Sequence, residues 1–162
     1  MELENLAIRK LEERGVKIED IAEITLFLQE KYIENLSIDD CISYVKDVIT
    51  KRESINAILT AIAIDEVAEK RLIDNEICNI ILEDSGLYGI DEILALSIVN
   101  VHGSIALTNF GYADKIKPGI VKVLDNIGKQ KQQCHTFLDD IVCAIAASAA
   151  SRIAHYGIEK SK

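Results

Sequence analysis

The segment 137–156 constrains the fold of this chain most, because the middle of it carries very little side-chain bulk. The run from Ala144 to Ser151 contains only alanine, serine and one isoleucine. Thr136 is placed to cap a helix that begins at Phe137. Small side chains on several faces of one helix allow neighbouring helices to approach closely. We therefore expect a helix from Phe137 to about Tyr156 at the centre of a bundle.

The rest of the chain also favours helices, since its apolar residues recur with a period near 3.6 and no segment shows strand alternation. Ser37 with Asp40, and Thr50 with Glu53, match the capping-box pattern of helix starts. Turn-forming residues interrupt the pattern at 83–89 and 128–134. Helices are predicted over 2–14, 18–32, 38–48, 51–72, 75–82, 89–99, part of 102–112, and 120–124.

The predicted fold class is therefore all-α, as a compact bundle of about six to nine helices around the Ala/Ser-rich C-terminal helix. With 162 residues, 49% of them hydrophobic, and a single proline, the chain has the material for one core and little for linkers. We expect one domain over residues 1–162. The broad apolar faces of the N-terminal helices also predict a homo-oligomer.

Charge and composition exclude several classes of function. A net charge of −9 argues against nucleic-acid binding, which needs a basic surface, and favours solubility. The apolar stretch 93–107 is too short and too polar to form a transmembrane segment. Four widely spaced cysteines and an acidic N-terminus without signal-peptide character predict reduced thiols and a cytoplasmic protein. Transient contact with a membrane surface remains compatible with this pattern.

Three acidic elements lie at or beside predicted helix ends and precede apolar residues: Asp91-Glu92, Asp114 and Asp139-Asp140. Helix capping explains each of them separately, because the helix dipole favours carboxylates in a first turn. Capping explains less well why Asp140 opens a central helix. A cluster of carboxylates without matching histidine or cysteine favours a hard cation, Mg²⁺ or alternatively Mn²⁺.

Basic and polar residues accompany these carboxylates. Lys117, three residues after Asp114, could bind a phosphate oxygen. His135 and Thr136, just before the acidic pair of the last helix, could donate hydrogen bonds to phosphate or take part in proton transfer. The sequence therefore predicts either a phosphate and metal site or a set of helix caps.

The order of these motifs resembles a known family. Asp114-x-x-Lys117-Pro118, followed by Asp139-Asp140-Ile141-Val142, is similar to the D-x-x-K-P…D-D signature of the phosphatidylglycerophosphatase A family. Asp91-Glu92 is similar to its upstream D-E pair. The context 88–92, 103–106 and 135–140 resembles a soluble Gram-positive branch of that family. The resemblance covers about residues 87–151.

The resemblance implies a Mg²⁺-dependent phosphatase that removes the terminal phosphate of phosphatidylglycerophosphate or a related phosphorylated small molecule or lipid head group. It implies Lys117 as the phosphate anchor. Its other implied catalytic residues, which are also the metal ligands, are Asp91, Glu92, Asp114, Asp139 and Asp140. The chain lacks the hydrophobic spans of membrane-embedded members and has Gly119 where they have a second proline. The alternative is a non-catalytic, self-associating helical module whose acidic pairs cap helices or hold a structural metal.

Overall fold

A computed structural model describes residues 2–158, and this part of the chain forms nine helices and no strand. The all-α prediction is confirmed. The helices, in chain order, are α1 (Glu2–Glu13), α2 (Ile18–Gln29), α3 (Ile38–Ile49), α4 (Arg52–Glu69), α5 (Asn75–Leu82), α6 (Ile90–Val99), α7 (Ser104–Ile116), α8 (Ile120–Lys129) and α9 (Leu138–Tyr156).

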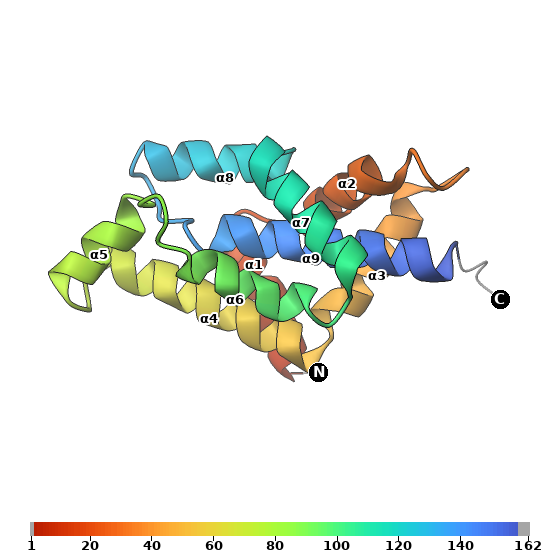
Figure 1. The fold of residues 1–162 in the computed structure, drawn as a ribbon. Helices are drawn as coiled ribbons and strands as arrows, with labels where there is room; N and C mark the ends of the chain where they lie inside the picture. The colour runs from red at the N-terminus through yellow and green to blue at the C-terminus, as the bar shows by residue number, and fades with distance from the viewer. Residues whose placement is uncertain (1, 159–162) are drawn as a thin grey trace.

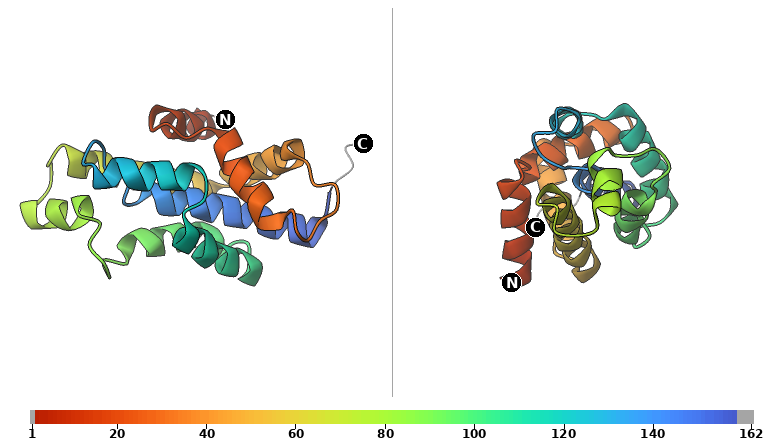
Figure 2. Two further views of the ribbon diagram at one scale, coloured as in Figure 1. Left: turned by 90° about the horizontal axis from the view of Figure 1, so that it is seen from above. Right: turned by 90° about the vertical axis from the view of Figure 1, so that its left-hand side faces the viewer.

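Helix α9 lies in the middle of the bundle, as its small side chains predicted. Helices α2, α3, α4, α6, α7 and α8 all pack against it, and the end-on view shows it surrounded by the others (Figure 2). Every residue from Leu138 to Ser151 is buried. A helix buried all round has no solvent-facing stripe, so any charge on it needs a partner inside the protein.

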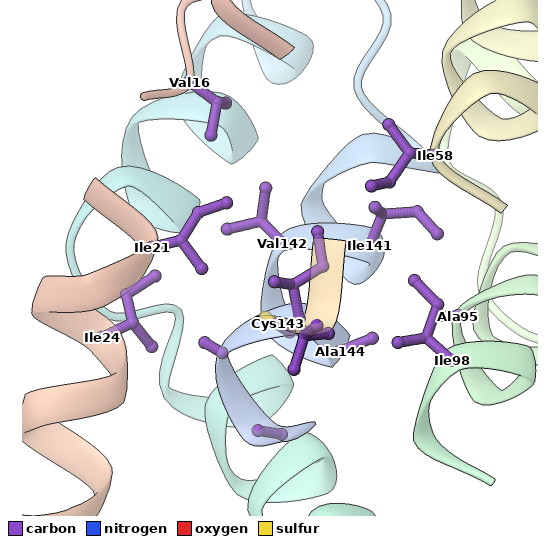
Figure 3. Packing of buried hydrophobic residues seen from close by; sticks show 14 of the residues in the cluster. Val16, Ile21, Ile24, Ile58, Ala95, Ile98, Ile141, Val142, Cys143 and Ala144 are labelled. Carbon is purple, nitrogen blue, oxygen red and sulfur yellow. The ribbon is translucent and has the colours of Figure 1, made fainter. Parts of the chain in front are cut away.

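Aliphatic side chains fill the space between α9 and its neighbours. Ile141 lies toward Ile58 of α4, and Val142 lies toward Ile21 of α2 (Figure 3). All four of these side chains are fully buried. The α2 helix also approaches closely enough for the Thr25 hydroxyl to donate a hydrogen bond to the backbone carbonyl of Ala146 in α9. Such packing fixes the position and rotation of α9.

Two predicted helices are longer in the structure than the sequence pattern indicated. Helix α7 continues through Gly111 to Ile116, and α8 continues to Lys129. A single glycine inside a helix weakens it by only about 1 kcal/mol, and the burial of Phe110 and Ala113 against the core offsets this. The extension places Asp114 in the last turn of α7, where its side chain faces α9.

The capping predictions were correct at one position and wrong at two. Ser37 and Asp40 form the predicted capping box of α3. Thr50 instead ends α3, and its hydroxyl donates to the Asp47 carbonyl. Thr136 does not cap α9; its hydroxyl donates to the carbonyl of Ile81. In the buried start of α9, a carboxylate from α4 takes the role of the cap.

The turn between α7 and α8 positions a lysine of the candidate site. Lys117 ends α7 in the left-handed conformation, with φ 55°, and its N–H donates to the Ala113 carbonyl at 2.8 Å. A residue before proline is disfavoured in the right-handed helical conformation, so Pro118 stops the helix here. The resulting bend directs the Lys117 side chain back toward α9.

The four cysteines are free and buried. None of the helices within residues 2–158 is long and apolar enough to cross a membrane.

Candidate active site

Asp139 and Asp140 lie in the first turn of α9 and are almost completely buried, with exposures of 4% and 3%. Burial removes hydration that stabilises a carboxylate, so two adjacent buried carboxylates require compensation. Neither side chain caps its own helix: the N-cap of α9 is Phe137, which makes no side-chain cap bond. The acidic pair therefore makes no side-chain N-cap bond, although its place in the first turn remains favourable to the helix dipole.

Lys117 links the α7 and α9 parts of the site. Its ammonium lies 3.0 Å from Oδ2 of Asp139 and 3.1 Å from Oδ1 of Asp114. These residues are separated by up to 25 positions in the sequence, and the turn at Pro118 brings them together. Both interactions are charge-assisted hydrogen bonds. Burial alone would lower the pKa of Lys117, but the two carboxylates outweigh it and raise that pKa, so the lysine stays charged.

One lysine does not neutralise the whole acidic cluster. Burial raises the pKa of Asp139 to about 7 in spite of the nearby Lys117. Burial, the charges of Asp139, Asp114 and Asp91, and a hydrogen bond with Asp114 raise the pKa of Asp140 to about 10. Without a further cation, Asp140 therefore holds a proton at neutral pH. If all of these carboxylates were ionised, their negative charge would exceed the positive charge of Lys117.

The start of α6 supplies further carboxylates. Asp91 is buried, and its Oδ1 atom has no hydrogen-bond partner among residues 2–158. Glu92 is exposed, but burial and the charges of Asp91, Asp114 and Asp84 raise its pKa. The charge of Asp114 contributes to the raised pKa of Glu92, so the start of α6 and the end of α7 lie close enough to interact electrostatically. An unpartnered buried carboxylate oxygen is costly unless a ligand or water completes it.

Sequence reasoning missed Asp84, which lies in the loop between α5 and α6. Burial, followed by the charges of Asp91, Asp125 and Asp114, raises the pKa of Asp84, while Lys117 opposes the rise. Asp84 therefore belongs to the same cluster as the predicted residues. It stands in the turn segment 83–89 beside Glu83, and nothing in its local pattern distinguished it from a solvated loop residue.

A cavity of about 280 Å³ adjoins the cluster, and Asp84, Asp139 and His135 are among the residues that line it. Lys129 and Lys131 also contribute to its wall. Neither ring nitrogen of His135 has a hydrogen-bond partner within the described part of the chain. Burial, and then the charge of Arg14, lowers the pKa of His135 to about 4, so the imidazole is neutral at pH 7. A ligand in this cavity would contact both carboxylates and other polar side chains.

The predicted phosphate-binding residues differ in their availability. His135 lines the cavity, but both of its ring nitrogens are buried and have no hydrogen-bond partner within residues 2–158, whereas the Thr136 hydroxyl is bonded to Ile81. The Thr136 side chain thus fixes the segment before α9 to the end of α5. Its hydroxyl oxygen can still accept a hydrogen bond, but its proton is engaged.

Two carboxylates of α4, which the sequence analysis did not single out, hold the start of α9 in place. Asp65 is fully buried and accepts hydrogen bonds from the N–H groups of Phe137 and Leu138 at 3.1 and 3.0 Å. Glu69, one turn later, accepts the N–H of Cys134 and pairs with Arg14 of the segment after α1. Burial raises the pKa of Asp65 to about 7, although both backbone donors oppose this.

The donor set suits a hard divalent cation better than a soft one, because it consists of carboxylate oxygens. Within residues 2–158, no three histidine, cysteine, aspartate or glutamate side chains stand in a ready metal-binding arrangement. The Lys117 ammonium occupies the space between Asp114 and Asp139. The unpartnered oxygen of Asp91 and the raised pKa of Asp140 nevertheless show that nearby positive charge does not balance these carboxylates.

Replacing Lys117 with methionine should destabilise the metal-free protein by about 2 kcal/mol at pH 8, because folding would then require Asp139 to take up a proton, or to ionise without a partner. In the folded state the pKa of Asp139 is already raised, and the substitution raises it further. A carboxyl group of this kind costs stability as pH rises from its unfolded to its folded pKa, so the penalty should be smaller at about pH 5. Urea unfolding in EDTA at both pH values measures the difference. Lys46→Met, at an exposed site on α3, is the control, and an equal penalty at both pH values would contradict the expectation.

Fold and site together define an all-α protein in which three helices, α6, α7 and α9, and the α5–α6 loop place carboxylates near a single lysine, beside a cavity. A family model described as phosphatidylglycerophosphatase A matches residues 10–155. The chain belongs to the phosphatidylglycerophosphatase A family.

Similar proteins span nearly the whole chain. It is 51% identical over 154 residues to the uncharacterized protein YutG of Bacillus subtilis, covering 95% of this chain and 92% of YutG. It is 56% identical over 145 residues to the uncharacterized protein YpjQ of the same organism, covering 90% of this chain and 80% of YpjQ. The crystal structure of the low temperature requirement C protein from Listeria monocytogenes has a TM-score of 0.90 at 57% identity, covering 94% of this chain and 95% of that one.

Proposed function

We propose that this protein is a metal-dependent phosphomonoester hydrolase that removes the terminal phosphate of phosphatidylglycerophosphate or of a related phosphorylated substrate. The observation that carries the proposal is the cluster of buried carboxylates around Lys117, in a chain of this family. The cluster keeps a proton on Asp140 unless more positive charge arrives. A structural role alone gives no reason to concentrate so much uncompensated acid at the start of the central helix.

The carboxylates divide into those that touch Lys117 and those that do not. Asp114 and Asp139 hold the lysine, while Asp140, Asp91 and Glu92 complete the predicted ligand set for Mg²⁺ or Mn²⁺. A divalent cation held there supplies charge neutralisation for a phosphate group and acidifies water. Because burial limits the access of bulk water to these oxygens, their attraction to a cation is stronger than it would be on the surface.

Lys117 can bind a phosphate oxygen without leaving the two carboxylates. Its side chain retains 29% exposure while it is bonded to both, so Lys117 lies where the site meets solvent. The positive charge would draw the phosphate into place and oppose the charge that develops as the ester bond breaks. The neutral His135 side chain lines the cavity with both ring nitrogens unpartnered, and it could donate a further hydrogen bond once its ring turns toward the phosphate.

The reaction requires a group that takes a proton from the attacking water. The oxygen of water forms a bond to phosphorus, the bond from phosphorus to the ester oxygen breaks, and the alcohol leaves with a proton. Asp84 lines the cavity and makes no salt bridge to Lys117. Its pKa is raised toward neutral pH, mainly by burial. These properties suit a general base, so we assign it that role.

Phosphate release from phosphatidylglycerophosphate in mixed detergent micelles tests the proposal. The purified protein should release inorganic phosphate with Mg²⁺ or Mn²⁺ and lose this activity in EDTA, and calorimetric titration should show metal binding at or below millimolar concentration. Absence of metal binding together with absence of phosphate release would favour a non-catalytic helical module. Restoring the activity by adding Mg²⁺ back after EDTA separates metal dependence from damage to the protein.

A further inference from the structure

Three large apolar side chains beside the candidate site face solvent. Leu87 is fully exposed, and Ile90 and Ile93 are exposed by 53% and 63%. Ile90 and Ile93 are one turn apart on α6, and Leu87 precedes them by one more turn length in the adjoining loop. These three exposed apolar residues, here called the α6 strip, precede and flank Asp91 and Glu92 in the sequence.

The backbone at Leu87 shows that its exposure is held in place. Leu87 has a φ of 67°, a left-handed conformation that costs a non-glycine residue about 1 kcal/mol or more. The next residue, Tyr88, packs its ring edge-on against Phe137 at the start of α9, with ring centroids 5.9 Å apart. Tyr88 thus anchors the loop to the site while Leu87 projects from it.

The opposite edge of the site carries positive charge. Residues 115–131 contain five lysines and one aspartate in a chain whose net charge is −9. Lys117 and Lys129 pair with carboxylates, which leaves the other three lysines without a salt bridge among the described residues. Lys115 and Lys122 are exposed there, beside the exposed side chains of Ile116 and Val123. In Figure 1, the start of α9 lies between α8 above and α6 below, so the two edges border the site from different sides.

We propose that the α6 strip and the lysines of 115–122 form a docking surface for an anionic phospholipid bilayer, which orients the candidate site toward lipid head groups. The apolar strip matches the boundary between head groups and acyl chains, and the lysines match the lipid phosphates. This inference rests on the proposed function, because a substrate anchored in a bilayer must reach Asp139 and Lys117 while its acyl chains stay in the membrane.

The net charge of the chain determines how such docking depends on salt. The −9 charge repels an anionic surface at long range, so binding depends mainly on apolar insertion and only locally on the lysines. Salt screens both the repulsion and the local attraction. Vesicle binding should therefore persist at about 0.5 M salt, unlike binding through a basic patch alone.

Flotation with vesicles of phosphatidylglycerol and phosphatidylcholine tests the docking surface without measuring activity. The protein should float with the vesicles. The variant Leu87→Ser/Ile90→Ser/Ile93→Ser should bind them at least about tenfold more weakly. These side chains are exposed, so the variant should keep the fold, which circular dichroism checks. Leu3→Ser is the matched control, because Leu3 is 57% exposed on α1, away from the site.

Two further measurements separate failure of this inference from failure of the proposed function. Hydrolysis of vesicle-bound substrate should fall in the triple variant in proportion to vesicle binding. Equal flotation of wild type and triple variant, or no flotation of either, would overturn the docking surface even if phosphate release were observed. A wild-type dimer that the triple variant dissociates, without vesicle binding, would reassign the strip to contact between copies and would likewise overturn it. Vesicle binding that depends on the strip, without phosphate release, would support docking and reject the phosphatase.

Discussion

Replacing Asp140 with asparagine should abolish metal-dependent phosphate release, by about a thousandfold or more, while the protein remains folded. Asparagine has the shape of a protonated aspartate, and the raised pKa of Asp140 shows that the metal-free protein already keeps this group protonated at pH 7. The substitution therefore removes little that the fold uses. It removes the anionic oxygen that a bound cation would use.

The same substitution should leave stability in EDTA unchanged or slightly increased. A carboxyl group whose folded pKa lies above its unfolded value costs stability as pH rises from the unfolded pKa toward the folded one. Asparagine has no such cost, so the free energy of unfolding of Asp140→Asn should exceed that of the wild type most clearly at alkaline pH. In Mg²⁺ the order should reverse, because metal binding stabilises only the wild type.

Phosphate release, metal titration and urea unfolding on the same preparation measure these effects. Asp47→Asn, at an exposed carboxylate on α3, is the control and should match the wild type in all three. An Asp140→Asn protein with full activity would remove Asp140 from the ligand set. A protein that fails to fold in EDTA would show that the carboxylate has a structural role instead.

The sequence predicted the fold because one physical signal dominated it. The small residues of 144–151 have no other efficient use than to allow close helix packing, and α9 indeed lies at the centre of the bundle. The ends of α7 and α8 were harder to predict. Gly111 and Pro118 both resemble turn residues, yet only Pro118 ends a helix, since packing of Phe110 and Ala113 holds Gly111 within α7.

The sequence predicted those residues of the candidate site that belong to recognisable motifs. It did not predict residues that join the site only through the path of the folded chain. The order of Asp91-Glu92, Asp114, Lys117 and Asp139-Asp140 was visible in the sequence, and the structure brings these residues together. Asp84 joins them through the path of the α5–α6 loop, which no local pattern encodes. Thr136 was expected to cap α9 for a sound local reason, but Asp65, more than 70 positions earlier, occupies that role.

The importance of Asp65 leads to the second prediction of large effect. Replacing Asp65 with alanine should lower the free energy of unfolding by about 3–5 kcal/mol. The substitution leaves the N–H groups of Phe137 and Leu138 without their acceptor in a fully buried place, and it removes one of the two acceptors of the Cys134 thiol. In a domain of this size, that loss should lower the midpoint of thermal unfolding by about 10 °C.

A comparison of two substitutions separates lost hydrogen bonds from lost volume. Asp65→Asn keeps the size and one acceptor oxygen, but its amide N–H group meets a backbone N–H donor. We therefore expect its free energy of unfolding to lie between those of the wild type and Asp65→Ala. Asp47→Ala removes an exposed carboxylate whose partner Arg152 is 3.4 Å away, and should cost no more than about 0.5 kcal/mol. Equal stability of Asp65→Ala and Asp47→Ala in urea unfolding would contradict the assignment of Asp65 as the anchor of α9. If Asp65 anchors α9, it also fixes the position of the acidic pair of the candidate site, because Asp139 directly follows Leu138, whose N–H group Asp65 binds.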